Sequence, residues 1–358
     1  MPGMEAVIVA GGLGSRLRPL TARRPKHVLP VAGEPLLAHQ LARLADAGVE
    51  HVVLATSYRA DELRWELGDG ERFGLRLSYA YEQTALGTGG AVRNALAELR
   101  GGAGDPVLVL NGDQLSDHDL RAQVSHFAAA GADVSLHVVI VGDPRPYGCV
   151  PTDAGGRVTA FREKSADPVS PQVNAGSYVF RRSVLGDIPA GVEVSLERET
   201  FPRLLRAGRA LVGYRDDGYW LDVGTPDALV RASSDLVRGL VRSPALPDPP
   251  GERLVHPSAR VHPGARVLGG SALGPDVVVG DRSVVDGSVL MAGAVLGTGT
   301  TVVASAIGPA AQVGDDSLVR ASVLGDAAVL GARCELVDGG RVGCDVRIPD
   351  DGLRFTAG

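Results

Sequence analysis

A six-residue repeat in the last part of the chain constrains its fold more than any other feature. One aliphatic residue returns at every sixth position, with the phase slipping by one residue partway. Small residues fill the steps between, as in HPSARV and HPGARV. This pattern is typical of a parallel β-helix and predicts about five triangular coils. The expected inward residues are Val255, Val261, Val267, Leu273, Val279, Val285, Leu290, Leu296, Val302, Ile307, Val313, Leu318, Leu324, Leu330, Leu336, Val342 and Ile348.

The first part of the chain alternates short apolar runs with helical patterns, which favours a Rossmann-like α/β domain. We expect a mixed, mostly parallel sheet with helices on both faces. The expected strands are Ala6–Ala10, His51–Thr56, Arg76–Tyr81, Val107–Leu110, Val134–Val141, Val158–Phe161 and Ala175–Phe180. The expected helices include Leu36–Ala47, Ala60–Leu67, Gly89–Leu99 and Asp119–Ala130.

A proline-rich stretch separates the two patterns. Ser243–Glu252 reads SPALPDPPGE, and proline at this density continues neither a helix nor a sheet interior. We therefore expect a catalytic domain over residues 1–240, a linker over 241–253 and a left-handed parallel β-helix over 254–350.

Composition excludes several classes of protein. A net charge of −6 offers no general footprint for nucleic acid, so an anionic ligand needs a local cluster of cations and backbone amides. The three cysteines have no metal-ligand spacing, and no apolar run approaches the roughly 18 residues of a membrane span. Neither a signal-peptide core nor a cleavage site follows Met1. We expect a soluble, cytoplasmic protein with no nucleic-acid or membrane partner.

The segment GGLGSRLRPLTARRPKHVLPVAGEP, which begins at Gly11, has the residues that a triphosphate requires. Its glycines let the backbone turn tightly and present N–H groups to a phosphate. Arg16 adds a planar donor fork and Lys26 a compact charge. The segment contains no GxxxxGK[ST] motif, so it is not a P-loop.

This segment resembles the opening signature of the nucleotidyltransferases that join a nucleoside triphosphate to a sugar 1-phosphate, close to GGxGTRLxPLTxxxPKPxLP. Ser15 replaces the threonine of that pattern, and His27 replaces the proline after the lysine. We expect His27 to be where this protein differs most from its relatives. The stretch Glu82–Gly90 resembles the family's base-recognition segment.

Two aspartates stand in settings where the family coordinates magnesium. Asp113 follows an apolar run in LNGD, at the end of a strand, where ligands collect in open α/β sheets. Asp222 lies far downstream in GYWLDVGTP. Two hard oxygen ligands suit a magnesium ion that keeps waters and takes phosphate oxygens as its other ligands.

Three short motifs resemble the family's sugar-phosphate site. They are Phe161–Lys164, with Ser165 where a proline is usual, Asn174–Gly176 and Pro146–Gly148. The stretch Ser195–Pro202 resembles a segment common among mannose-1-phosphate guanylyltransferases; it also fits an N-cap with a capping box.

The resemblance implies a role for each matched residue. Arg16 and Lys26 act in catalysis, Asp113 and Asp222 hold Mg²⁺, and other positions bind the substrates. The expected nucleotide-binding residues are Ala10, Gly11, Gly12, Gly14, Ser15, Arg16, Glu82, Gly87, Thr88, Asn111 and Gly112. The expected sugar-phosphate-binding residues are Gly148, Glu163, Lys164 and Asn174.

The resemblance implies transfer of a nucleoside monophosphate to a sugar 1-phosphate with release of pyrophosphate, and favours GTP and mannose 1-phosphate. Glucose 1-phosphate with dTTP, UTP or ATP is the main alternative, and a specialised sugar or cyclitol phosphate is another. Two other classes remain open: a catalytically silent, nucleotide-sensing subunit of the same fold, and an acyltransferase built on the β-helix. Because relatives with this second domain are commonly oligomers, we expect a homo-oligomer formed through the β-helix.

Overall fold

The computed structural model describes residues 3–354 except 58, 163 and 165. The chain divides into two compact units, which are described separately. Unit 1 comprises Met1–Gly12 and Gln40–Trp220, and unit 2 comprises Leu13–His39 and Leu221–Gly358. No helix among the described residues is long and apolar enough to cross a membrane.

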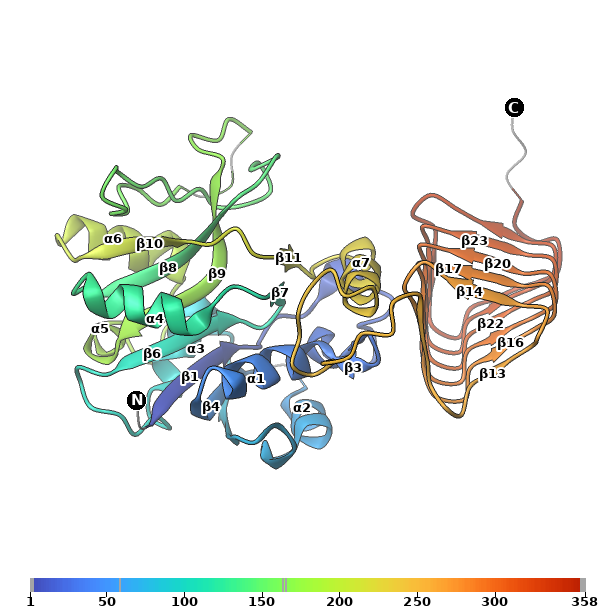
Figure 1. Ribbon diagram of the computed structural model, residues 1–358, viewed down its shortest axis with the longest axis horizontal. Helices are drawn as coiled ribbons and strands as arrows, with labels where there is room; N and C mark the ends of the chain where they lie inside the picture. Colours follow the sequence, from blue (N-terminus) through green and yellow to red (C-terminus); the bar gives the residue numbers. More distant parts are fainter. Residues whose placement is uncertain (1–2, 58, 163, 165, 355–358) are drawn as a thin grey trace. The chain divides into compact units, whose positions relative to one another are not determined.

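Unit 1 is built on a seven-stranded sheet in the order β10-β8-β9-β6-β1-β4-β5 (Figure 1). Only β9 runs antiparallel to its neighbours, so the expected mixed, mostly parallel sheet is confirmed. The strands are β1 (Met4–Val9), β4 (Val49–Thr56), β5 (Arg76–Tyr81), β6 (Pro106–Asn111), β8 (Val134–Ile140), β9 (Gln172–Arg181) and β10 (Leu211–Arg215).

Helices cover both faces of this sheet because its central strands are apolar on both sides. Val7 and Val53 join one core cluster with Ala91 of α3, whereas Ile8 and Leu54 are buried toward the other face. The helices are α1 (Leu36–Asp46), α2 (Ala60–Leu67), α3 (Gly87–Ala95), α4 (Leu120–Ala129), α5 (Arg182–Gly186) and α6 (Phe201–Arg206). Two short strands, β7 (Gln114–Ser116) and β11 (Trp220–Asp222), lie outside this sheet.

One expected strand is wrong. Val158–Phe161 forms no strand; Val158 makes only an isolated bridge with Thr152. Its apolar character reflects burial, because Val158 packs in the main core cluster of unit 1. The Val158 amide also donates to the carbonyl of Leu211 at 2.9 Å. Leu211 begins β10, the edge strand that the sequence analysis did not anticipate.

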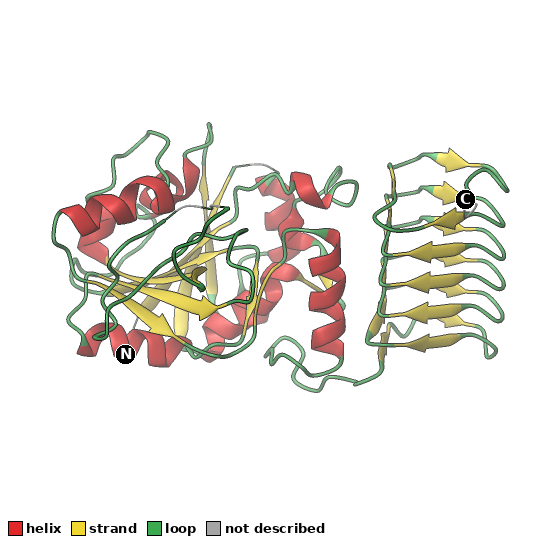
Figure 2. Ribbon diagram, turned by 90° about the horizontal axis from the view of Figure 1, so that it is seen from above, coloured by secondary structure: helices red, strands yellow, loops and turns green. Residues whose placement is uncertain are grey.

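Unit 2 contains a parallel β-helix, as expected, in which the strands of successive coils form three parallel sheets (Figure 2). Two sheets have six strands and one has five, all paired in parallel. Handedness of the coil stays a prediction. The strands are β12 (Arg253–Val255), β13 (Arg260–Val261), β14 (Arg266–Leu268), β15 (Ser271–Leu273), β16 (Val278–Val279), β17 (Val284–Asp286), β18 (Val289–Leu290), β19 (Val295–Leu296), β20 (Thr301–Val303), β21 (Ala306–Ile307), β22 (Gln312–Val313), β23 (Leu318–Arg320), β24 (Val323–Leu324), β25 (Val329–Leu330), β26 (Glu335–Leu336), β27 (Arg341–Val342) and β28 (Arg347–Ile348).

The coils explain the slip in the six-residue repeat. Hydroxyl groups inside the helix accept bonds from backbone amides 17 residues later, as Ser271 does from Ser288 and Ser288 from Ser305. A 17-residue coil is one residue short of three hexapeptides, so the aliphatic phase shifts. One expected inward residue is therefore wrong: Val319, which pairs with Val302, is fully buried, and Leu318 is only partly buried.

Unit 2 also holds two segments from outside the β-helix. Helix α7 (Pro226–Val237) lies beside its first coils, where Ser234 Oγ donates to the Gly269 carbonyl at 2.7 Å. Residues 13–39 carry two short helical turns, Ser15–Leu17 and Lys26–Val28. A small hairpin of β2 (Pro30–Val31) and β3 (Glu34–Pro35) follows these turns.

A buried basic cluster lies in unit 1 away from the residues matched to the family. The rings of His118 and His137 stack with centroids 3.6 Å apart, and Arg43 Nη2 lies 2.9 Å from His118 Nδ1. Both ring nitrogens of His137 lack a hydrogen-bond partner among the described residues. Burial, reinforced by Arg43, lowers the pKa of His137 to about 3, and burial lowers that of His118 well below its usual value.

These depressed pKa values predict that unit 1 loses stability in mild acid. As pH falls from about 6.5 toward 5, His137 takes up a proton in the unfolded chain but stays neutral in the folded protein, so unfolding is favoured. We expect His137→Leu to flatten the pH dependence of the unfolding free energy by about 1 kcal/mol per pH unit. Urea unfolding followed by the fluorescence of Trp65 and Trp220, both in unit 1, measures this. Exposed His256 supplies the control, His256→Gln, and equal slopes in all three proteins would contradict the account.

Candidate functional site

Two segments of unit 1 that are expected to bind the nucleotide leave neighbouring strands at the same sheet edge. Val9 of β1 pairs with Asn111 of β6, so Ala10–Gly12 and Asn111–Asp113 emerge side by side. The Gly112 amide donates to the Val9 carbonyl at 2.9 Å and fixes this arrangement. Within the described chain, the N–H groups of Gly11 and Gly12 donate no hydrogen bond and remain available to a phosphate.

Glu82 occupies the corresponding edge of β5 and shapes the loop before α3. One carboxylate oxygen accepts the Leu86 amide at 3.0 Å. The other, Oε1, is buried with no hydrogen-bond partner in the described part of the chain. Burial raises the pKa of Glu82, and the bond from Leu86 opposes that rise. An unsatisfied buried acceptor at this position is available to a donor on a ligand.

The glycines of the base-recognition segment have a packing reason as well. An added Cβ on Gly87 would come within 2.7 Å of the Val194 carbonyl oxygen, and one on Gly90 within 2.6 Å of that of Val192. The amides of Gly89 and Gly90 donate to the Val194 carbonyl at 2.8 and 3.2 Å. These glycines therefore let α3 approach the backbone of residues 192–194.

Glu197 connects the base-recognition segment to the sugar motifs. Its carboxylate accepts bonds from Thr88 Oγ1 at 2.7 Å and from Ser195 Oγ at 3.0 Å. The Tyr178 hydroxyl lies 3.5 Å from its other oxygen and accepts from Asn174 Nδ2 at 2.7 Å. Burial and the nearby Glu197 charge raise the pKa of Tyr178 well above its usual value. Our sequence analysis used Glu197 only as a subfamily signal, and this network gives it a position beside predicted site residues.

The sugar motifs also come together in unit 1. The Asn174 amide donates to the Gly148 carbonyl at 2.9 Å, and Cys149 exchanges two backbone bonds with Arg162. Gly176, at φ 74°, packs against the Asn111 side chain, where a Cβ would approach Nδ2 to 2.8 Å. Gly148, Asn174 and Asn111 are therefore neighbours. Lys164 is exposed, and the expected residue Glu163 lies outside the described residues, as does Ser165.

In unit 2, Gly14 sets the conformation of the signature loop, residues 13–29. It has φ 62°, and a Cβ there would meet Lys26 Cβ and Thr21 Cγ2 at 3.0 Å each. The Thr21 hydroxyl donates to the Gly14 carbonyl at 2.8 Å. The tight turn thus brings the stem of Lys26 against the glycine that precedes Ser15 and Arg16.

Arg16 and Asp222 flank a third residue of unit 2, the buried Gly224. An added Cβ on Gly224 would collide with the Arg16 guanidinium and come within 2.7 Å of Asp222 Oδ1. The next residue, Thr225, caps helix α7 by accepting the Ala228 amide at 3.3 Å, with Pro226 in the first turn. The DVGTP sequence therefore places the Asp222 carboxylate just before α7. The absence of a side chain at Gly224 leaves room for the Arg16 guanidinium.

The donor chemistry of the two aspartates fits magnesium. Asp113 follows Gly112 just after the end of β6, and Asp222 ends β11 with Oδ1 buried. The described residues contain no group of three or more His, Cys, Asp or Glu side chains placed to hold a metal. Carboxylate oxygens suit Mg²⁺, which usually keeps waters and binds substrate phosphates.

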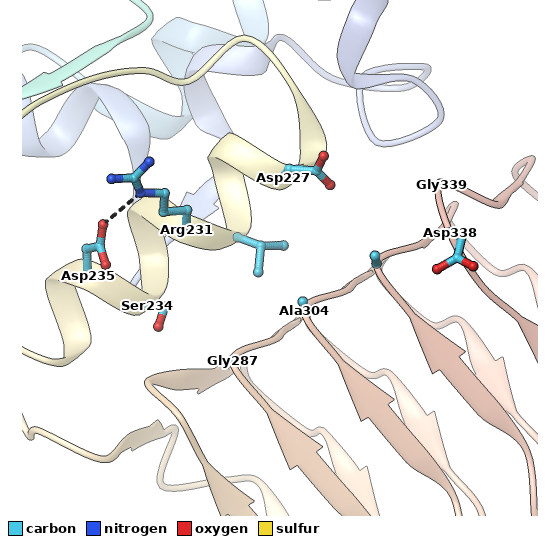
Figure 3. Close-up of a pocket in the computed structure, with 10 residues that line it drawn as sticks. Asp227, Arg231, Ser234, Asp235, Gly287, Ala304, Asp338 and Gly339 are labelled. Atoms are coloured by element: carbon cyan, nitrogen blue, oxygen red, sulfur yellow. Dashed lines mark hydrogen bonds and ion pairs between the residues drawn. The ribbon is translucent and has the colours of Figure 1, made fainter. Parts of the chain in front are cut away.

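A groove of about 540 Å³ lies elsewhere in unit 2, between α7 and one corner of the β-helix (Figure 3). Arg231 and Asp235 form an ion pair at 3.4 Å on its helix side. Its β-helix side is formed by small corner residues such as Gly287 and Ala304. None of the predicted site residues lines it.

Comparison with known proteins decides the family. Residues 5–239 match the model of a family described as nucleotidyl transferase. The chain belongs to the nucleotidyl transferase family. Residues 250–342 match a second model, the GMPPB C-terminal domain.

Individual relatives are similar over about 72% of the chain. The chain is 51% identical over 259 residues to a mannose-1-phosphate guanylyltransferase of Mycobacterium tuberculosis, covering 72% of this chain and 71% of that protein. It is 35% identical over 266 residues to the catalytic subunit beta of mannose-1-phosphate guanylyltransferase of Drosophila melanogaster, with the same coverage of 72% and 71%.

Solved structures resemble the sheet-containing part of the chain. A putative glucose-1-phosphate thymidylyltransferase of Bacillus anthracis in complex with a sucrose has TM-score 0.59 and 26% identity, covering 65% of this chain and 94% of that one. HddC of Yersinia pseudotuberculosis complexed with GMP-PN has TM-score 0.56 and 26% identity, covering 65% and 99%.

The contact between Gly224 and Arg16 predicts the effect of one added methyl group. In Gly224→Ala the new Cβ displaces the Arg16 guanidinium, so we expect kcat for nucleotide transfer to fall about 10- to 100-fold. Gly186→Ala is the matched control, because a Cβ at Gly186 meets no atom within 4 Å. Steady-state kinetics with circular dichroism as a folding check measures this. Wild-type kcat in Gly224→Ala would show that Arg16 is misassigned.

Proposed function

We propose that this chain is a mannose-1-phosphate guanylyltransferase, which transfers GMP from GTP to mannose 1-phosphate and releases pyrophosphate. One observation carries the proposal: the 51% identity with the Mycobacterium tuberculosis enzyme, together with the match of the GMPPB C-terminal domain. The family does not fix the base or the sugar, since the structurally similar Bacillus anthracis protein is named a putative glucose-1-phosphate thymidylyltransferase. The product of the proposed reaction is GDP-mannose.

Backbone amides and two cations bind the phosphates of GTP. The free amides of Gly11 and Gly12, with Gly14, Ser15 and Arg16 of the signature loop, bind the triphosphate. Arg16 and Lys26 neutralise the leaving pyrophosphate. Glu82, Gly87 and Thr88 bind the guanine. Asn111 and Gly112, at the end of β6, bind another part of the nucleotide.

The acceptor phosphate is bound by a separate set of unit 1 residues. Lys164 balances its charge, while Gly148, Glu163 and Asn174 bind the sugar. Asp113 and Asp222 hold Mg²⁺, which supplies charge neutralisation at the phosphates when bound.

The chemistry needs no protein nucleophile. An oxygen of mannose 1-phosphate is already anionic at neutral pH and attacks the α-phosphorus of GTP in line with the leaving pyrophosphate. The chain contributes by orienting the two phosphates and by stabilising charge as the bond to pyrophosphate breaks.

We further propose that the enzyme acts in the cytoplasm as a homo-oligomer, with the β-helix supplying the subunit interface. Stacked coils leave flat faces and an open end, which are surfaces suited to symmetric association. Light scattering on the full chain measures the number of subunits.

A substrate matrix tests the proposed function. Purified chain is incubated with Mg²⁺, each of GTP, dTTP, UTP and ATP, and each of mannose and glucose 1-phosphate, and pyrophosphate release is measured. We expect kcat/KM for GTP with mannose 1-phosphate to exceed every other pair by about 100-fold. A faster reaction of dTTP with glucose 1-phosphate would overturn the assignment, and no release from any pair would favour a silent nucleotide-sensing subunit.

The proposed magnesium ligands and the signature lysine give a second test. We expect Asp113→Asn, Asp222→Asn and Lys26→Ala each to lower kcat about 100-fold or more, because each removes charge that balances the transition state. The two Asn variants also require more Mg²⁺ for half-maximal rate. Asp248→Asn, in the exposed linker, is the control and keeps wild-type kinetics. Nearly full Mg²⁺-dependent release in Asp113→Asn or Lys26→Ala would refute these roles.

A further inference from the structure

The signature loop contacts the last coils of the β-helix within unit 2. Arg341 Nη1 donates to two carbonyls of the loop, that of Arg16 at 2.9 Å and that of Arg18 at 2.8 Å. Arg24 forms a two-pronged ion pair with Asp326, with nitrogen–oxygen distances of 3.0 and 2.5 Å. The loop is therefore held at its start and at its middle by residues more than 300 positions later in the chain.

Two further contacts support the same attachment. Arg23 forms an ion pair with Asp345. The Cys344 thiol lies 3.7 Å from the carbonyl oxygen of Pro19. Asp326, Arg341, Cys344 and Asp345 lie in the last coils of the β-helix, and we call them the coil-end set.

Regular coil stacking places the coil-end set in one position. Strand β27, which begins with Arg341, is the last strand of its sheet and pairs with β24. Asp326 and Asp345 lie in the turns after these two strands, and the Asp345 amide donates to the Asp326 carbonyl at 2.9 Å. Asp326 and Asp345 therefore lie in neighbouring turns of successive coils, and each pairs with an arginine of the signature loop.

Arg341 bonds backbone atoms of the loop, whereas the Arg24–Asp326 contact joins two side chains. The carbonyl bonded by Arg341 belongs to Arg16, whose guanidinium packs over Gly224 beside Asp222. The Asp326 side chain is only 8% exposed and that of Arg24 only 23%, so this pair is shielded from solvent far more than an ordinary surface pair. Bonds between a guanidinium and carbonyl or carboxylate oxygens are stronger than neutral ones.

We propose that Arg341 and Asp326 are positioning residues for GTP, through which the β-helix holds the signature loop in its triphosphate-binding conformation. The proposal rests on the proposed function and goes beyond it, because it gives the second domain a part in each catalytic cycle. Arg341 touches no reacting atom; it acts through the backbone of Arg16 and Arg18. The acceptor sugar phosphate depends on unit 1 residues and does not depend on this contact.

Kinetics of Arg341→Ala separate positioning from loss of fold. We expect KM for GTP to rise about tenfold, the factor that 1.4 kcal/mol carries, while KM for mannose 1-phosphate stays within about twofold. Arg341→Lys keeps a positive donor and recovers part of the loss. Arg320→Ala removes another exposed arginine of the β-helix, one paired with Asp338 at 3.4 Å, and leaves both KM values unchanged. A lower kcat with both KM values unchanged in Arg341→Ala would mean a smaller folded fraction and would overturn the proposal.

An exchanged ion pair tests Asp326 independently. Arg24→Asp and Asp326→Arg should each raise KM for GTP, and the double variant should restore it toward the wild-type value. Additive defects in the double variant would show that the two residues do not act through one another, and would refute the role of this pair.

A readout that needs no turnover keeps this inference distinct from the proposed function. We expect hydrogen exchange at the amides of residues 13–24 to speed up in Arg341→Ala relative to wild type and Arg320→Ala. If the wild type transfers no nucleotide to any acceptor, the proposed function fails while faster exchange still shows the loop is held by Arg341. If the wild type is active and neither exchange nor KM for GTP changes in Arg341→Ala, only this inference fails.

Discussion

The backbone conformation of the signature loop is the constraint on which the proposed chemistry depends. A chain of net charge −6 must hold a triphosphate with local amides and a few cations, so small shifts of the loop displace most of the available positive charge. Gly14 sets the turn, and its φ of 62° admits few other residues. Arg341 and Asp326 then hold the loop from the β-helix. These contacts are the basis for our proposal that the second domain positions the loop.

Much of the fold was predictable because two periodicities were strong. The aliphatic repeat predicted the parallel β-helix, and alternation of apolar runs with helical patterns predicted the mixed sheet. The prediction that Leu318 points inward was wrong because a 17-residue coil shifts the phase by one residue. Its aliphatic neighbour Val319 occupies the inward position instead. Strand β10 was missed because an edge strand of five residues has little apolar signal of its own.

The candidate site was predictable where residues fall in contiguous motifs, and less so where contacts join distant segments. Comparison with known proteins confirms the family that the signature segment indicated. The spacing of motifs could not show that Gly224 leaves room for Arg16, or that the glycines of the base-recognition segment pack against residues 192–194. Nor could it pair Arg341 with the loop, since an exposed arginine on a β-helix strand looks like any solvated surface charge.

In the proposed mechanism the chain transfers GMP directly between two phosphates by positioning and charge neutralisation, without a covalent enzyme intermediate. The stereochemical course at the α-phosphorus tests it most directly. GTP bearing one sulfur at that phosphorus, in a single configuration, is converted with mannose 1-phosphate and the product is analysed by phosphorus NMR. A single in-line displacement predicts inverted configuration in the GDP-mannose analogue. Retention would reveal two displacements through a guanylylated side chain and would contradict the account.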